Sequence, residues 1–486
     1  MDYTRLSIAE IQEGLRHKKF SCQEITAAHL KRIAQVEPKL KAFLTVAGEE
    51  ALARAAGLDK ELEAGEPLRP LTGVPIAIKD NICAKGIKTT CGSRILGNYV
   101  SPYSATVVER LEAAGAVIAG KTNCDEFGMG SSTENSAFAI TANPFDLERV
   151  PGGSSGGSAA SVAAYEAVGA FGSDTGGSVR TPAAFCGVFG LKPTYGRVSR
   201  YGLVAFSSSL DTIGPFARSA EDLAVLLQIT AGYDALDMTS HPSIPEIYTT
   251  GLDTPLQSHR VGVPFSLIEE GVEAETRQAM QRAVDALKRQ GCQVHEIELP
   301  HLQYAIATYY LIATSEASSN LARYDAVKYG YRAEEFTDLI DMYRKTRAKG
   351  FGAEVKRRIM LGTFALSSGY YDAYFLKASK VRTLLIQDFQ KAFASVDTIL
   401  MPITPTLAFR VGEKTSDPLA MYLTDVFTVS ANLAGIPALS IPAGYSAENL
   451  PVAVQLLGNH FQEKTLLNVA WHLHREFQLP EAKLAV

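Results

Sequence analysis

Pro151-Gly-Gly-Ser-Ser-Gly-Gly-Ser158 and Ser173-Asp-Thr-Gly-Gly-Ser-Val-Arg180 place several serines among glycines. Glycines let the backbone approach a substrate closely and direct several N–H groups at one point, while a serine can supply an attacking hydroxyl. The two segments therefore predict a hydrolase site. A flexible linker is the alternative interpretation, but the stretch from Ala159 to Phe171 between them is apolar and rich in small residues, whereas linkers are polar.

A serine nucleophile needs a base, and the histidines are poorly placed to provide one. The chain has nine histidines, and none lies between Leu30 and Ser240. Lys79, at the end of the strand-like run Leu71-Thr-Gly-Val-Pro-Ile-Ala-Ile-Lys79, is the candidate base. Burial beside Ile76 and Ile78 would lower the pKa of its amine toward the range in which it can accept a proton. A surface lysine at a strand end is the alternative.

Three other motifs pass through the same glycine-rich segments. Gly152-Gly-Ser-Ser-Gly156 matches the nucleophile elbow, with a histidine such as His460 as its base, but the elbow follows an apolar strand, and Asp146-Leu-Glu-Arg-Val-Pro151 is charged. Asp174-Thr-Gly176 matches the aspartic-protease triplet, which needs a second copy that only a homodimer would supply. Neither segment ends in the Gly-Lys-Ser/Thr of a phosphate-binding loop.

Lys79, the Gly-Gly-Ser-Ser-Gly-Gly-Ser run and the Asp-Thr-Gly-Gly-Ser178 run together resemble the amidase signature family. The resemblance implies a Ser-cisSer-Lys triad, in which Ser178 attacks the amide carbon, Ser154 relays the proton and neutral Lys79 accepts it. The backbone amides that would hold the oxyanion of the tetrahedral intermediate belong to Thr175, Gly176, Gly177 and Ser178.

Later segments resemble one branch of that family, the A subunits of tRNA-dependent amidotransferases, nearly end to end. This closer resemblance is carried by Phe351–Gly362, Gly369–Tyr374, Met421–Phe427 and Asn432–Pro437. It implies a glutamine pocket in which Arg358 forks onto the α-carboxylate and Asp425 holds the α-ammonium. The residues that would line the pocket near the side-chain amide are Ser131 and Tyr309.

Residue patterns alone would assign these pocket residues differently. The basic cluster that runs from Arg344 to Arg358 is typical of a solvated helix face, and less so of a tRNA footprint. Asp425 by itself would be a capping or surface carboxylate. The pocket is therefore an expectation that the resemblance supplies.

The function implied by the resemblance is that of a glutaminase subunit in an amidotransferase. Ammonia released from L-glutamine would convert Glu-tRNA(Gln), or Asp-tRNA(Asn), to Gln-tRNA(Gln) or Asn-tRNA(Asn). The implied assembly is a heterotrimer with a B subunit, which binds the charged tRNA and uses ATP and Mg²⁺, and a small C subunit. No cofactor is expected in this chain. The alternatives are a stand-alone amidase acting on other carboxamides and a non-catalytic scaffold subunit.

Length and composition fit a large globular enzyme. The chain has 486 residues, 46% of them hydrophobic, and a formal net charge of −5, which argues against a dominant phosphate-binding surface. Because the site residues span the sequence, we expect one domain over residues 1–486, with N-terminal helices over about 1–65 and a possible loop or boundary at 232–259.

Cysteine usage and the absence of hydrophobic signals bear on localisation. The six cysteines show no C-x-x-C spacing, which favours reduced thiols in the cytoplasm, and we expect no metal site. The N-terminus lacks a basic region leading into an apolar stretch, and no run of about eighteen apolar residues occurs. We therefore expect a cytoplasmic protein that does not contact a membrane.

Helical and strand patterns alternate, which is typical of an α/β fold, here with a central mixed sheet covered by helices on both faces. Ser21-Cys-Gln-Glu24 is a capping box that begins a helix to about Val36. Gly157 to Ala170 is expected to form one helix of small residues whose amino end faces the serines. The other predicted elements are helices at 49–63 and 105–114, strands at 74–79 and 116–119, and a strand-helix-strand unit at 261–264, 273–290 and 294–299.

Overall fold

The computed structural model describes residues 2–269 and 271–486. Within them, eleven strands form one mixed sheet in the order β1-β3-β2-β4-β6-β5-β10-β11-β9-β7-β8. The strands are β1 (Phe43–Val46), β2 (Pro75–Lys79), β3 (Val117–Thr122), β4 (Gly169–Asp174), β5 (Phe189–Lys192), β6 (Thr212–Ala217), β7 (Arg260–Val263), β8 (Gln293–Glu296), β9 (Thr398–Pro402), β10 (Ala438–Tyr445) and β11 (Pro451–Gly458). The predicted central mixed sheet is thus confirmed.

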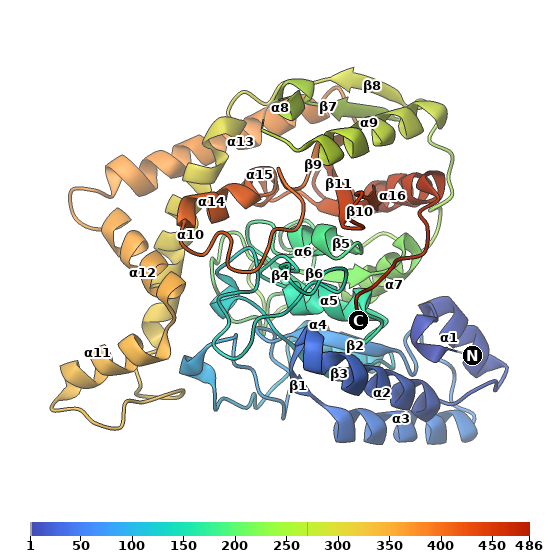
Figure 1. The fold of residues 1–486 in the computed structure, drawn as a ribbon, viewed down its shortest axis with the longest axis horizontal. Coiled ribbons are helices and arrows are strands. Elements are labelled where there is room, and N and C mark those ends of the chain that lie inside the picture. The colour runs from blue at the N-terminus through green and yellow to red at the C-terminus, as the bar shows by residue number, and fades with distance from the viewer. Residues whose placement is uncertain (1, 270) are drawn as a thin grey trace.

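The helices of the described residues surround this sheet. They are α1 (Ile8–Arg16), α2 (Cys22–Leu40), α3 (Gly48–Glu63), α4 (Thr106–Ala113), α5 (Gly156–Ala163), α6 (Arg180–Phe185), α7 (Ala220–Thr230), α8 (Phe265–Glu269), α9 (Ala274–Arg289), α10 (Ala305–Asn320), α11 (Leu339–Gly350), α12 (Ala353–Ala365), α13 (Lys377–Phe393), α14 (Pro418–Tyr422), α15 (Val429–Ala434) and α16 (Glu463–Phe477). Figure 1 shows α1 to α3 gathered at one end of the sheet, and α10 to α13 in a lobe from which α11 projects.

Both faces of the central strands are covered. Successive residues of a strand point to opposite faces, and every residue of β2, β3, β4 and β6 is buried. An apolar cluster joins Ile76 of β2, Leu223 of α7 and Leu466 of α16, so distant parts of the sequence share one core. The continuous sheet favours the expected single domain over residues 1–486, which stays a prediction.

The predicted capping box is present at the start of α2. Ser21 Oγ accepts the Glu24 N–H, and the Glu24 carboxylate accepts the Ser21 N–H at 2.8 Å. The helix continues to Leu40, beyond its predicted end. The strand-helix-strand unit is also confirmed, because β7 and β8 pair in parallel and α9 connects them. No helix or strand lies between α7 and β7, where residues 232–259 are all described.

The predicted helix from Gly157 to Ala170 is wrong in its second half. Helix α5 ends at Ala163, Tyr165 has a positive φ of 63°, and Gly169 and Ala170 begin β4. A buried run of small residues has no polar face, so its periodicity cannot distinguish a helix from a fully covered strand. Pairing of Gly169 with Ile76 of β2 decides for the strand.

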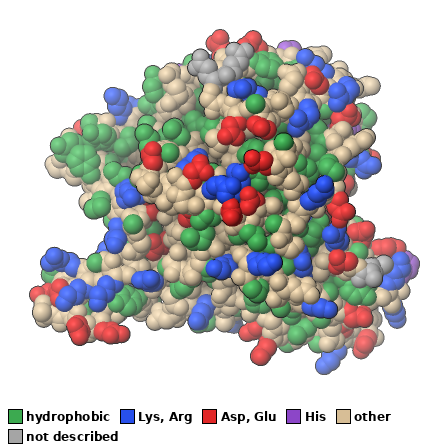
Figure 2. Space-filling view, in the orientation of Figure 1, with side chains coloured by type: hydrophobic (Ala, Val, Ile, Leu, Met, Phe, Trp, Pro, Cys, Tyr) green, Lys and Arg blue, Asp and Glu red, His purple; other side chains and the backbone are tan. Residues whose placement is uncertain are grey.

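Hydrophobic side chains gather at the edge of the molecule where α12 leads into α13, whereas charges of both signs are spread over the rest of the visible face (Figure 2). We call this exposed group the aromatic patch. Its members are Met360, Leu361, Phe364, Tyr370, Tyr371 and Tyr374. None of the helices in the described part of the chain combines the length and apolarity that a membrane span requires.

Candidate active site

The site lies where two neighbouring strands end. Strands β2 and β4 pair in parallel, so Lys79 at the end of β2 and Asp174 at the end of β4 reach the same edge of the sheet. Helix α5 begins at Gly156, directly after the first serine-rich segment. The topology therefore brings together Lys79 and both glycine-rich segments, as the sequence predicted.

Lys79 is fully buried among serine hydroxyls. Its Nζ lies 2.7 Å from Ser154 Oγ, 2.9 Å from Ser155 Oγ and 2.9 Å from Ser173 Oγ. Burial lowers the pKa of the Lys79 amine from its usual value, although the carboxylates of Asp125 and Asp174 oppose this effect. The local interpretation of Lys79 as a surface residue is therefore wrong.

The two serine segments lie side by side. The peptide bond between Gly153 and Ser154 is cis. The Ser155 N–H donates to Ser178 O at 3.1 Å, which fixes the segment that carries Ser154 against the predicted nucleophile. Ser178 is 7% exposed, in contrast with the fully buried Lys79. A substrate could thus reach Ser178 while the lysine stays away from solvent.

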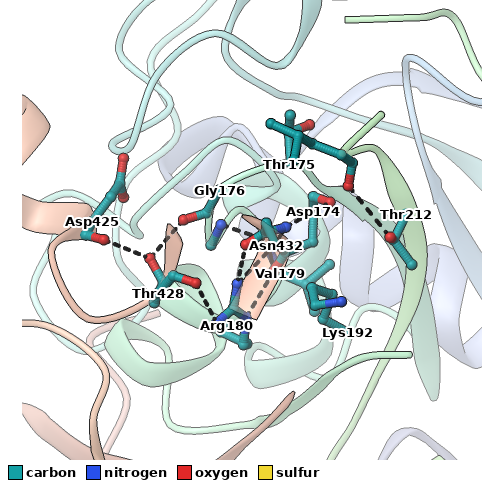
Figure 3. Close-up of polar contacts among 12 residues, drawn as sticks. Asp174, Thr175, Gly176, Val179, Arg180, Lys192, Thr212, Asp425, Thr428 and Asn432 are labelled. Carbon is teal, nitrogen blue, oxygen red and sulfur yellow. Dashed lines mark hydrogen bonds and ion pairs between the residues drawn. The ribbon is translucent and has the colours of Figure 1, made fainter. Parts of the chain in front are cut away.

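A buried ion pair shapes the loop that carries Ser178 (Figure 3). Arg180 donates to the Asp174 carboxylate from Nε and from Nη2, both at 3.1 Å. The same carboxylate accepts the N–H groups of Gly177 at 2.9 Å and Val179 at 3.0 Å. Burial alone would raise the pKa of Asp174, but Arg180 outweighs it and holds the pKa at about 2. The loop therefore folds around an ionised carboxylate.

This network engages one of the four predicted oxyanion amides. Because the Gly177 N–H donates to Asp174, it points toward the carboxylate in this structure. Thr175 is held through its side chain, whose hydroxyl donates to Asp211 at 2.7 Å. The ring of Tyr309 packs against Gly176, because a Cβ added at this glycine would lie 2.5 Å from Tyr309 Cζ. An oxyanion role would therefore fall to the amides beside Gly177.

Arg180 and Thr428 join the loop that carries Ser178 to the segment that carries Asp425. Arg180 Nη1 donates to Thr428 O at 3.0 Å, and Thr428 Oγ1 lies 2.6 Å from Gly176 O and 3.1 Å from Asp425 O. Arg180 Nη2 also donates to Asn432 Oδ1 at 2.6 Å. These contacts, drawn in Figure 3, place Asp425 close to the loop that carries Ser178, the predicted nucleophile.

Asp425 and Ser131 are in direct contact, whereas the predicted pocket places Ser131 near the side-chain amide of glutamine and Asp425 at its α-ammonium. Ser131 Oγ donates to Asp425 Oδ2 at 2.7 Å, and Tyr310 Oη lies 3.5 Å from the same oxygen. Burial raises the pKa of Asp425 to about 7, while the Ser131 hydroxyl and Arg358 act in the opposite direction. The expectation of a surface carboxylate, drawn from the local pattern alone, is wrong.

Arg358 lies at 2% exposure within an aromatic and acidic surrounding. Its Nε donates to Glu354 Oε1 at 2.7 Å, and Tyr422 Oη donates to the same oxygen at 2.8 Å. The guanidinium carbon lies 5.1 Å from the Tyr310 ring centroid and 5.4 Å from that of Tyr422. The predicted solvated helix face is therefore wrong at Arg358, because the helix turns this side chain into the protein.

The residues named for the nucleophile elbow and the aspartic-protease triplet make other contacts in the structure. His460 Nε2 is engaged with Ala434 O at 3.1 Å, so this candidate base contacts a carbonyl. Asp174 pairs with Arg180, whereas an aspartic-protease site would pair it with a second carboxylate. In residues 2–269 and 271–486, no group of three or more His, Cys, Asp or Glu side chains is arranged to hold a metal ion.

Sequence reasoning missed the residues that hold the site in place. These are Asp125, Glu126, Asp174, Arg180, Asp211, Glu354, Thr428 and Asn432. Asp174 and Arg180 stood inside the segment that predicted the site, and an acid and a base bracketing a glycine-rich loop could have suggested an ion pair. Glu354 stands four residues before Arg358, and an acid and a base at that spacing on a helix could have suggested their pairing. The others are distant in sequence from the serines and gave no local signal.

The chain belongs to the amidase family, whose model matches residues 24–467. It is 56% identical to the A subunit of glutamyl-tRNA(Gln) amidotransferase from Carboxydothermus hydrogenoformans over 483 residues, or 99% of each chain. It is 57% identical to the protein of the same name from Acaryochloris marina over 466 residues, or 96% of each. The crystal structure of the A subunit of glutamyl-tRNA(Gln) amidotransferase from Thermotoga maritima matches with a TM-score of 0.82 at 41% identity, covering 100% of this chain and 99% of that one.

Proposed function

We propose that this chain is the glutamine-hydrolysing subunit of a tRNA-dependent amidotransferase. The observation that carries the proposal is the contact of buried Lys79 with Ser154, 2.7 Å apart, together with the buried side chains of Arg358 and Asp425, which both contact Tyr310. A free amino acid carries one group of each sign. Arg358 and Asp425 would therefore bind the two charged groups of glutamine, and the relatives are named as A subunits of glutamyl-tRNA(Gln) amidotransferase.

The hydroxyls around Lys79 support its role as the base. Ser155 Oγ donates to Ser173 O at 3.1 Å, so its oxygen is the acceptor toward Lys79. Asn81 Nδ2 donates to Ser173 Oγ at 2.9 Å. A neutral amine can then give its two N–H groups to Ser155 and Ser173 and turn its lone pair to the Ser154 hydroxyl. Burial favours this neutral form of Lys79.

The reaction that follows is an acyl transfer through Ser178. Ser154 would pass its proton to Lys79 and take the proton of Ser178, whose oxygen forms a bond to the side-chain carbonyl carbon of glutamine. The carbon–nitrogen bond then breaks, and the departing ammonia receives a proton through Ser154. Water cleaves the glutamyl ester in a second cycle, which releases glutamate and restores Ser178. The amides of Thr175, Gly176 and Ser178 are the proposed oxyanion donors.

The pocket residues would orient glutamine for this attack. Arg358 Nε is engaged by Glu354, which leaves the two Nη groups of the fork for the α-carboxylate. Asp425, fixed by Ser131, would hold the α-ammonium. Tyr309, packed against Gly176, would line the pocket near the reacting amide. Arg358 and Asp425 would thus bind the α-carboxylate and α-ammonium of glutamine, with the side-chain amide at Tyr309.

The chain would act within an assembly. We propose a B subunit that binds the charged tRNA and uses ATP and Mg²⁺, and a small C subunit, with no cofactor held by this chain. The relatives are named as subunits, and an exposed cluster of large apolar side chains such as the aromatic patch commonly marks an interface. The proposed location is the cytoplasm, consistent with six buried free cysteines.

Ammonia release from L-glutamine tests the proposal. We expect activity in the purified assembly, loss of activity in Ser178→Ala, and retained activity in Ser161→Ala, a buried serine of α5 whose hydroxyl donates to the Ser158 carbonyl. Cleavage of simple amides without any activity on glutamine would favour a stand-alone amidase. Failure of an electrophilic glutamine analogue to label Ser178, together with no hydrolysis, would favour a non-catalytic scaffold.

A further inference from the structure

Asp125 and Glu126 are two consecutive acidic residues that the triad and the pocket do not use. Both are buried, Asp125 at 0% and Glu126 at 1% exposure. They lie between β3 and the loop that carries Ser131, with Glu126 at the start of the short helical turn Glu126–Gly128. Burying two adjacent carboxylates is costly unless both are hydrogen-bonded, so their partners indicate what they do.

Asp125 connects the pocket loop to the segment that carries Ser154. Its carboxylate accepts the N–H groups of Thr133 at 2.9 Å and Asn135 at 3.1 Å, while its own N–H donates to Ser154 O at 3.1 Å. Thr133 has a positive φ of 66°, a conformation that these bonds hold in place. Asp125 therefore shapes the loop and contacts the relay serine at the same time.

Thr133 extends this connection around Ser154. Its hydroxyl donates to Gly152 O at 2.8 Å and accepts the Gly156 N–H at 3.0 Å. One side chain thus spans the segment on both sides of Ser154. Since Asp125 fixes the backbone of Thr133, loss of the Asp125 carboxylate would loosen the relay serine as well as the loop.

Glu126 contacts a different element, the start of helix α12. Its Oε2 accepts the N–H of Gly352, the N-cap residue of α12, at 2.7 Å, and its Oε1 accepts the Ser93 hydroxyl. Gly352 leaves room for this contact, because a Cβ there would overlap Glu126 Oε2. Helix α12 carries both Glu354 and Arg358, so Glu126 fixes the starting point of the helix that presents the arginine.

We propose that Asp125 and Glu126 are paired positioning residues, in which Asp125 sets the geometry of the Ser154 relay and Glu126 sets the position of Arg358 toward the glutamine α-carboxylate. The inference rests on the proposed glutaminase function. It assigns separate consequences to two neighbouring residues, since one acts on the reacting groups and the other acts on substrate recognition.

Two substrates separate these effects. We would measure kcat/KM in the assembly for L-glutamine and for butanamide, a short carboxamide without the α-carboxylate and α-ammonium. For Glu126→Ala we expect the ratio of the two values to fall about tenfold, because one charge-assisted hydrogen bond that orders Arg358 is lost. For Asp125→Ala we expect kcat on both substrates to fall about a hundredfold with the ratio within about twofold of wild type.

Conservative variants distinguish positioning from general damage. Glu126→Gln keeps one acceptor for Gly352, and its amide can donate to Ser93. The ratio of kcat/KM for glutamine to that for butanamide should therefore stay close to the wild-type value. Ser93→Ala removes the second partner of Glu126 and should lower the ratio a few-fold, which also keeps the test open if Glu126→Ala does not fold. Glu463→Ala is the matched control, because buried Glu463 accepts the Thr194 N–H at 2.9 Å in another part of the fold. It should lower thermal stability without changing the ratio.

Glutamine affinity, measured by calorimetry in a Ser178→Ala background, gives an independent readout. Glu126→Ala should raise Kd about tenfold, and Asp125→Ala should leave it within about threefold. Equal losses on both substrates in Glu126→Ala, or an unchanged ratio in Ser93→Ala, would overturn the inference. Wild type that hydrolyses butanamide but neither binds nor hydrolyses glutamine would instead overturn the proposed function.

Discussion

Lys79 Nζ lies 2.7 Å from Ser154 Oγ, although the two residues are 75 positions apart in the sequence. The contact depends on strand β2 ending beside the serine segments, inside the protein. Lys79 is therefore in the environment in which an amine loses its proton most readily, because no solvent stabilises the ammonium form.

Replacing Lys79 should abolish hydrolysis of glutamine and of simple amides alike. Lys79→Met lacks a base, and Lys79→Arg keeps a permanent charge, so we expect both to lose at least about a thousandfold in kcat. The measurement is steady-state ammonia release, with intact folding checked by circular dichroism. Substantial activity in Lys79→Arg would show that a neutral amine is not required.

Ser154 and Ser178 should differ in what their variants can still do. Ser178→Ala cannot form the acyl-enzyme, whereas Ser154→Ala keeps the nucleophile and loses its proton relay, with a kcat reduced about a hundredfold or more. Mass spectrometry after addition of an electrophilic glutamine analogue should detect slow labelling of Ser178 in Ser154→Ala. Labelling of the Ser178→Ala protein at another residue would contradict this assignment.

Arg358→Ala should affect glutamine but spare amides that lack a carboxylate. The expected result is an increase of about a hundredfold in KM for glutamine, with little change for butanamide, because only glutamine presents an anion to the fork. Arg358→Lys should recover only part of the affinity, since an ammonium cannot form the paired hydrogen bonds. Lys356→Ala, an exposed neighbour on the same helix whose ammonium donates to the Ala348 carbonyl, is the control. A similar loss there would argue against a specific role of Arg358.

The pH dependence of kcat/KM for glutamine should include the ionisation of Asp425. Its pKa is raised to about 7 by burial, so the carboxylate that would hold the ammonium forms only as the pH rises through this value. We therefore expect kcat/KM for glutamine to increase between pH 6 and 8 (about one unit on each side of that pKa). For butanamide, kcat/KM should vary with pH only through the ionisation of Lys79, because this substrate has no ammonium group for Asp425 to bind. In Asp425→Asn, kcat/KM for glutamine should be low and should lose the additional limb.

The ion pair of Arg180 with Asp174 should contribute strongly to stability. Arg180→Leu leaves a buried carboxylate without its partner, and we expect the free energy of unfolding to fall by about 3 to 5 kcal/mol, measured by urea denaturation. The pKa of Asp174 is lowered to about 2, so its stabilisation is present above its ordinary value of 3.8 and disappears as the pH falls through about 2. The variant should lack this acid-dependent loss. An unchanged midpoint would contradict the prediction.

Local sequence signals predicted the elements that local interactions form. The capping box Ser21-Cys-Gln-Glu24 places donor and acceptor within one turn, and α2 begins where it predicts. Strand β2 is predicted at 74–79 from the apolar run that ends at Lys79. Helix α5 was predicted too long, because the small residues after Ala163 pack equally well in a covered strand and only pairing with β2 selects that outcome.

The sequence alone predicts the class of reaction and the residues that would carry it. The serines among glycines predict a hydrolase site, and the histidine-free span makes Lys79, at the end of a strand, the candidate base. The triad and the glutamine pocket are what the resemblance to the amidase family implies. Only the tertiary structure shows which side chains and backbone amides are buried, and which are already engaged in hydrogen bonds. It turns Arg358 inward, engages the Gly177 amide with Asp174, and joins both halves of the site through Asp125 and Glu126. Those contacts join residues far apart in the chain, and their energies depend on burial, which no local pattern encodes.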